Sequence, residues 1–97
     1  MRSDKLKNIT KLRMIIPTVN EWIESNKIVI ADIYKSLQLL KSFEIDKITI
    51  TDTLELSEKE NNKICYIDLN SIKRIGIVNG VCNIKYNDFD IMISKAA

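Results

Sequence analysis

Apolar residues in the first half of the chain recur every three or four positions. Spacing of this kind is typical of amphipathic helices that bury one face. The series consists of Leu6, Ile9, Leu12, Ile16, Val19 and Ile23, followed by Ile30, Ile33, Leu37 and Leu40. We therefore predict two or three helices within residues 4–43, the last of them over about 29–43.

Pro17 interrupts this series. Proline has no amide hydrogen, and its ring clashes with the preceding helical turn. Thr18 and Glu21, which follow directly, have the spacing of a capping box at the start of a helix. The sequence leaves two interpretations of residues 4–25 open: one helix kinked at Pro17, or two helices of about 4–15 and 19–25.

From Lys47 onward apolar and polar residues alternate, which is typical of strands with one side facing solvent. Asn79 and Gly80 separate two such runs. They form the preferred dipeptide of a type I′ hairpin turn, in which both residues need a positive φ. Polar residues 57–63 and 87–88 predict two further turns. We expect a four- to five-stranded antiparallel meander over about residues 47–94.

Together these patterns predict a single α+β domain over residues 1–97, with the helices packed on one face of the sheet. Cys65 and Cys82 share the apolar parity of their strands, so we expect both thiols to be buried and reduced. The residues expected in the core are Ile33, Leu37, Leu40, Ile48, Ile50, Ile67, Ile84 and Ile91.

The composition removes most catalytic and metal-binding chemistry. The chain has no histidine, the commonest general base and metal ligand. Cys65 and Cys82 lack the close spacing of zinc ligands. Asp88 and Asp90 have no third ligand or phosphate-binding loop near them in the sequence. We expect no catalytic residues, no metal site and no cofactor, and hence a protein that is not an enzyme.

No apolar run approaches the roughly 20 residues that span a bilayer, and the N-terminus lacks the apolar segment of a signal peptide. We expect a cytoplasmic protein without a membrane partner. Ile, Lys and Asn are frequent and arginine occurs only three times. This bias indicates an AT-rich genome, and small proteins of this kind are common in phages and mobile elements.

We expect the function to be the binding of another protein, as an adaptor, an immunity-type protein or a phage or mobile-element inhibitor. Self-association is the related alternative, because an unpaired sheet edge is a template for strand addition. Aromatic anchors and an acidic stretch over residues 43–60 supply the candidate partner-binding surface. These candidates are Trp22, Tyr66, Glu55 and Glu58.

The alternative function is a small nucleic-acid-binding regulator. Its phosphate contacts would come from a basic N-terminal helix carrying Lys5, Lys7, Lys11 and Arg13. A helix near residues 32–40 and the Asn79–Gly80 hairpin would form a winged-helix-like arrangement. The net charge of only +2 and the absence of arginine from residues 32–40 favour a protein partner over nucleic acid.

Overall fold

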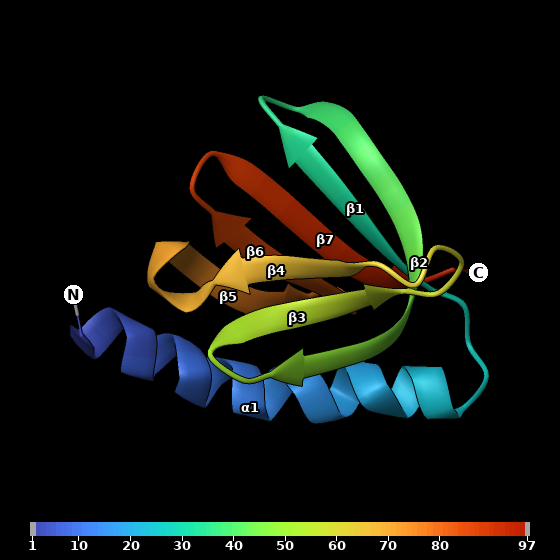
Figure 1. Ribbon diagram of the computed structural model, residues 1–97, viewed down its shortest axis with the longest axis horizontal. Helices are drawn as coiled ribbons and strands as arrows, with labels where there is room; N and C mark the ends of the chain where they lie inside the picture. Colours follow the sequence, from blue (N-terminus) through green and yellow to red (C-terminus); the bar gives the residue numbers. More distant parts are fainter. Residues whose placement is uncertain (1, 97) are drawn as a thin grey trace.

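The computed structural model describes residues 2–96, in which one long helix precedes a seven-stranded sheet (Figure 1). The helix α1 spans Arg2–Glu24. The strands are β1 (Val29–Lys35), β2 (Gln38–Ile50), β3 (Thr53–Glu58), β4 (Ile64–Asp68), β5 (Ile72–Val78), β6 (Val81–Tyr86) and β7 (Phe89–Lys95), and the short 3-10 helix η1 (Leu69–Ser71) joins β4 to β5. The predicted α+β class is confirmed.

All neighbouring strands are antiparallel, in the order β4-β3-β2-β1-β7-β6-β5. β1 is therefore the central strand, and its Ala31 pairs with Phe43 of β2 on one side and with Ile93 of β7 on the other. The long strand β2 pairs first with β1 and then with β3. Register shifts along β2 mark irregularities of the kind that bend a strand, and the sheet is strongly curved (Figure 1).

The helix α1 runs along the open side of the curved sheet, in contact with β1, β2, β5 and η1 (Figure 1). Leu12, Ile15 and Val19 recur at helical spacing and enter the core, where they meet the inward-facing residues of the strands. The part of the chain that the structure describes contains no helix with the length and apolar character needed to cross a membrane.

Asn8 fixes the first half of α1 to the turn between β4 and β5. Its buried side-chain amide donates hydrogen bonds to the carbonyl oxygens of Leu69, at 2.9 Å, and Ile72, at 3.0 Å. Leu69 is the first residue of η1, and Ile72 follows η1 at the start of β5. One side chain therefore connects α1 to two backbone carbonyls of this turn.

The helix continues without a break through Pro17, so of the two interpretations left open the structure shows the single helix. Thr18 and Glu21 lie inside this helix instead of capping it. Pro17 is on the exposed side. The apolar face of Leu12, Ile15 and Val19 continues across it. Burial of these side chains, about 1.5–3 kcal/mol each, outweighs the roughly 3 kcal/mol cost of an internal proline.

The predicted helix over residues 29–43 is wrong, because this segment forms β1 and the first half of β2. Ile33 is half-buried, whereas Leu37 is 94% exposed and Leu40 53% exposed. A tight turn at Ser36 and Leu37 places apolar residues of two strands at intervals that imitate a helix. The sheet therefore has seven strands, not four or five.

The alternation of apolar and polar residues predicted after Lys47 is present, but the run is divided by a turn. The chain reverses at Thr51 and Asp52, so that Ile50 of β2 pairs with Leu54 of β3. Asn79 and Gly80 have φ values of 53° and 77°, which confirms the predicted left-handed turn between β5 and β6. Ile48, Ile67, Ile84 and Ile91 are buried as predicted, and Ile50 is half-buried.

Candidate docking surface

The hairpin of β1 and β2 carries an apolar tip at the end of the sheet remote from α1 (Figure 1). Leu37 is 94% exposed at its turn, and Leu39 and Leu40 are 49% and 53% exposed beside it. Lys35 and Lys41 flank them. We call these five residues the leucine tip. Large exposed apolar patches rimmed by polar residues mark interaction sites.

The backbone of this tip is strained. Lys35 pairs with Gln38, which leaves Ser36 and Leu37 as a two-residue turn with φ values of 50° and 65°. Such turns favour Asn and Gly, as at the hairpin of β5 and β6, because other residues cost roughly 1–2 kcal/mol each in this conformation. Leu37 thus raises the free energy of the fold in two ways, through its left-handed backbone conformation and through the exposure of its apolar side chain to water. Strain of this kind concentrates at functional sites.

The leucine tip is positively charged. Residues 33–43 contain two lysines and no acidic residue. The Lys35 ammonium lies 5.5 Å from the centre of the Phe89 ring, and that of Lys41 lies 4.9 Å from the centre of the Phe43 ring. Both contacts hold the cations at the base of the apolar projection. The surface combines an apolar end with a basic rim.

Glu58 anchors one of these lysines from inside the fold. Lys41 Nζ donates to Glu58 Oε2 at 2.8 Å, and Asn61 Nδ2 donates to Oε1 at 3.3 Å. The hydrogen bond from Lys41, supported by that from Asn61, lowers the pKa of the Glu58 carboxyl although its burial acts in the opposite direction. Glu58 is only 3% exposed, so its charge serves the base of the hairpin and not an outer surface.

Two of the other residues singled out from the sequence lie together. Tyr66 of β4 pairs directly with Glu55 of β3 on the outer side of the sheet, and Tyr66 is 60% exposed. Trp22 belongs to a different surface. It packs partly against the core near the end of α1, with Lys95 Nζ 5.3 Å from its ring centre.

The basic residues of α1 do not form part of a winged helix. Lys7, Lys11 and Arg13 are exposed on α1, and Lys5 is half-buried. However, residues 32–40 are strands and a turn, so the helix expected to enter a nucleic-acid groove does not exist. The basic residues of α1 therefore lack the second element that the arrangement requires.

The thiols and carboxylates do not gather into a reactive centre. Residues 2–96 contain no group of three or more Cys, Asp or Glu side chains placed to hold a metal ion. Cys82 is buried, and burial raises the pKa of its thiol to about 11. Burial also raises the pKa of the half-buried Cys65, and neither cysteine forms a disulfide. Both thiols are thus poor nucleophiles.

No family model, curated protein or solved structure matches the chain. The leucine tip escaped prediction because Ser36 and Leu37 lack the Asn-Gly signature of a tight turn. The only available signal was the β-branched run of Val29 and Ile30, which favours a strand.

Proposed function

We propose that this protein is a non-enzymatic binding module that docks on another protein through the leucine tip. The observation that carries the proposal is the 94% exposed Leu37 at a strained, left-handed turn. Burial of this side chain contributes about 1.5–3 kcal/mol to association, and the partly exposed Leu39 and Leu40 add to it. An apolar centre surrounded by a polar rim is the usual anatomy of a protein–protein interface.

The charges of the tip define the chemistry of the partner. Lys35 and Lys41 flank the leucines, with no carboxylate in the hairpin between Ile33 and Phe43. A complementary partner has an apolar groove for the leucines and acidic side chains around its rim. Such complementarity accelerates encounter and fixes orientation more than it adds affinity.

A protein partner is favoured over an anionic membrane. Stable electrostatic attachment to lipid uses clusters of about four to eight basic residues. The leucine tip has two, and Lys41 already pairs with Glu58. Nucleic acid is less favoured still, because leucines do not read base edges and the basic residues of α1 lie on another element.

The test replaces Ser36 and Leu37 by Asn and Gly, the pair that the chain already uses in its other tight hairpin. This double variant removes the apolar anchor and relaxes the turn, so its free energy of unfolding should rise by about 1–2 kcal/mol. A photo-crosslinking residue at position 37 first identifies the partner in a lysate of the source organism. Affinity for the purified partner should then fall about tenfold or more in the double variant.

Met14, which is 74% exposed on α1, supplies the matched control. Met14→Asn should leave the affinity unchanged, and a crosslinker at position 14 should not capture the same protein. Undiminished binding by the Asn-Gly variant would refute the proposal. Binding to anionic vesicles that disappears in that variant would replace the protein partner with a membrane.

A further inference from the structure

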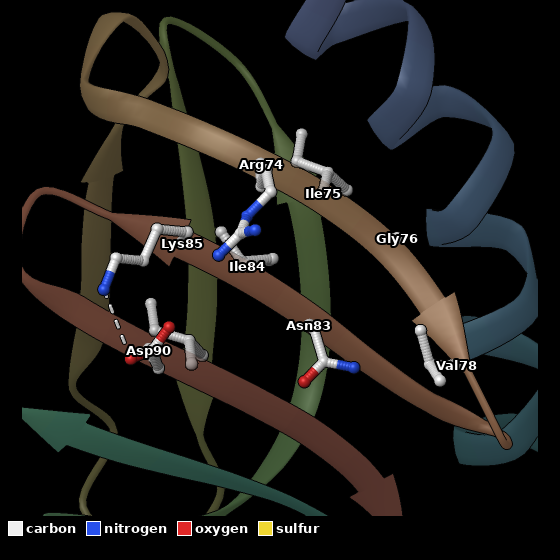
Figure 2. Close-up of a pocket in the computed structure, with 9 residues that line it drawn as sticks. Arg74, Ile75, Gly76, Val78, Asn83, Ile84, Lys85 and Asp90 are labelled. Atoms are coloured by element: carbon white, nitrogen blue, oxygen red, sulfur yellow. Dashed lines mark hydrogen bonds and ion pairs between the residues drawn. The ribbon is translucent and has the colours of Figure 1, made fainter. Parts of the chain in front are cut away.

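A shallow pocket lies on the outer face of β5, β6 and β7, away from the core (Figure 2). Its volume is about 380 Å³. The polar groups at its rim come from all three strands, with Arg74 on β5, Asn83 and Lys85 on β6 and Asp90 on β7. Gly76 lies on β5 opposite Asn83, and we call this the Gly76 pocket. It shares no residue with the leucine tip, so it stands independently of the proposed function.

Two cations lie directly opposite each other in this pocket. Arg74 pairs with Lys85 across β5 and β6, and both side chains are drawn on the pocket side of the sheet (Figure 2). Like charges in this position repel and destabilise a sheet. Lys85 is partly compensated by Asp90, at 3.4 Å between Nζ and Oδ2. Among the described residues no carboxylate pairs with Arg74, so the pocket has an excess positive charge beside a planar guanidinium.

Gly76 leaves the backbone of β5 bare within the pocket. Its φ is not positive, and a Cβ added to it would meet no atom within 4 Å. Neither conformation nor packing therefore requires glycine, which weakens the interior of a strand. A bare strand position permits the close approach of a ligand. Asn83, which pairs with Gly76, forms a wall beside it, and its Nδ2 is held by the Val81 carbonyl at 3.0 Å.

We propose that the Gly76 pocket binds a small planar anion, an acid group attached to an aromatic ring. The acid group lies on Arg74 and Lys85, where it relieves their repulsion and accepts hydrogen bonds from the guanidinium. The ring lies flat on the bare backbone of Gly76, between Asn83 and the exposed Val78. Carboxylate and phosphate share this chemistry, and the choice of probe distinguishes them.

The experiment is a titration of the full chain, labelled with ¹⁵N, with four probes. Phenyl phosphate and benzoate carry ring and charge, inorganic phosphate carries charge alone, and benzyl alcohol carries the ring alone. We expect the amide signals of Gly76 and Asn83 to shift with the first two and to saturate at the lowest concentrations. The tighter of these two identifies the acid group. Equal affinity for inorganic phosphate or for benzyl alcohol would overturn the proposal.

Four variants assign the binding to the pocket. Arg74→Gln should weaken phenyl phosphate binding by about tenfold or more, whereas Lys73→Gln removes the same charge from a neighbouring exposed position outside the pocket and should have little effect. Asp90→Asn removes the competing carboxylate and should strengthen binding.

Gly76→Val fills the pocket and suits a strand, so it should abolish binding without lowering the melting temperature. A Gly76→Val protein that remains folded and binds phenyl phosphate normally would overturn the proposal. Equal losses in the Arg74 and Lys73 variants would do so as well.

Discussion

Glu58 illustrates how one side chain couples a surface to the core. Its carboxylate is almost completely buried, while its partner Lys41 keeps half of its side chain in solvent at the base of the hairpin. The alternation of β3 places Glu58 on the same side as Leu54 and Leu56, which are core residues. A charged group on the core-facing side of a strand needs a partner, and Lys41 and Asn61 both donate hydrogen bonds to it.

The first prediction concerns the pH dependence of this group. The pKa of Glu58 in the folded protein lies below its ordinary value of 4.5, so the ionised carboxylate stabilises the fold above that pH. This contribution is lost as the pH falls through the folded pKa. Glu58→Gln should therefore cost about 1 kcal/mol at neutral pH, since Lys41 is screened by water. In urea unfolding curves the difference from the unmodified protein should shrink in acid.

The control is Glu55→Gln, because Glu55 is less buried and pairs with no lysine. Its effect on the free energy of unfolding should be small at both pH values. A constant difference between the Glu58→Gln variant and the unmodified protein, from neutral pH to acid, would contradict the assignment.

At the scale of the element, α1 shows that packing against the sheet can outweigh the local conformational preference of a residue. The proline rule predicted a break at Pro17, and the spacing of apolar residues predicted a face that continues past it. The structure follows the second rule, because Leu12, Ile15 and Val19 are all in the core. A sequence alone does not reveal which rule prevails, since the decision depends on a sheet assembled from distant residues.

The second prediction is that Pro17→Ala stabilises the protein. Alanine restores the missing amide donor and removes the clash of the ring with the preceding turn, and Pro17 is exposed. The gain should be positive and at most about 3 kcal/mol. It is measured as a rise in the melting temperature. A fall in that temperature would show that the ring itself is needed for packing.

The third prediction concerns the attachment of α1 to η1. Asn8→Ala leaves the buried carbonyls of Leu69 and Ile72 without their donor, which should cost about 1–3 kcal/mol. Thr10→Ala removes an exposed hydrogen bond to Leu6 of the same helix and serves as the control. Its cost in chemical denaturation should be much smaller. Equal costs for the two variants would refute a special role for Asn8.

The β half of the chain was more predictable than the helical half. Alternation identified the inward faces of β4, β6 and β7, and Asn79–Gly80 identified a turn, because both signals are local. The hairpin of β1 and β2 was not recognised, because its turn has residues that disfavour it and its leucines imitate helical spacing. Among the candidate partner-binding residues, Tyr66 and Glu55 lie side by side because β3 and β4 are consecutive strands that pair. This proximity could be predicted from the sequence, and the positions of the other candidates could not.

At the scale of the whole molecule, the two cysteines become exposed by different motions: Cys65 by local opening of an edge strand and Cys82 by global unfolding. Cys82 is completely buried in β6, which has a paired strand on each side, and Cys65 is half-buried in the edge strand β4. Local fluctuations expose edges readily, whereas the core opens only on global unfolding. The pKa of the Cys82 thiol, about 11, further lowers its reactivity at neutral pH.

The fourth prediction follows from this difference. With a bulky thiol reagent under native conditions, Cys65 should react slowly and Cys82 more slowly still. The labelling rate of Cys82 should follow the free energy of unfolding when Asn8→Ala destabilises the protein. The rate of Cys65 should change less. Mass spectrometry of each cysteine-containing peptide separates the two. Rapid labelling of Cys82 in the stable protein would contradict the fold described for β6.

The central position of β1 bears on how the polypeptide matures as it leaves the ribosome. β1 is synthesised first among the strands, yet one of its two ladders is formed with β7, which is synthesised last. Until β7 emerges, the nascent chain presents an open, apolar strand in the middle of what will become the sheet. Such an edge pairs readily with other chains. The emergence of β7, and not the formation of α1, is therefore the step that covers this open edge of β1.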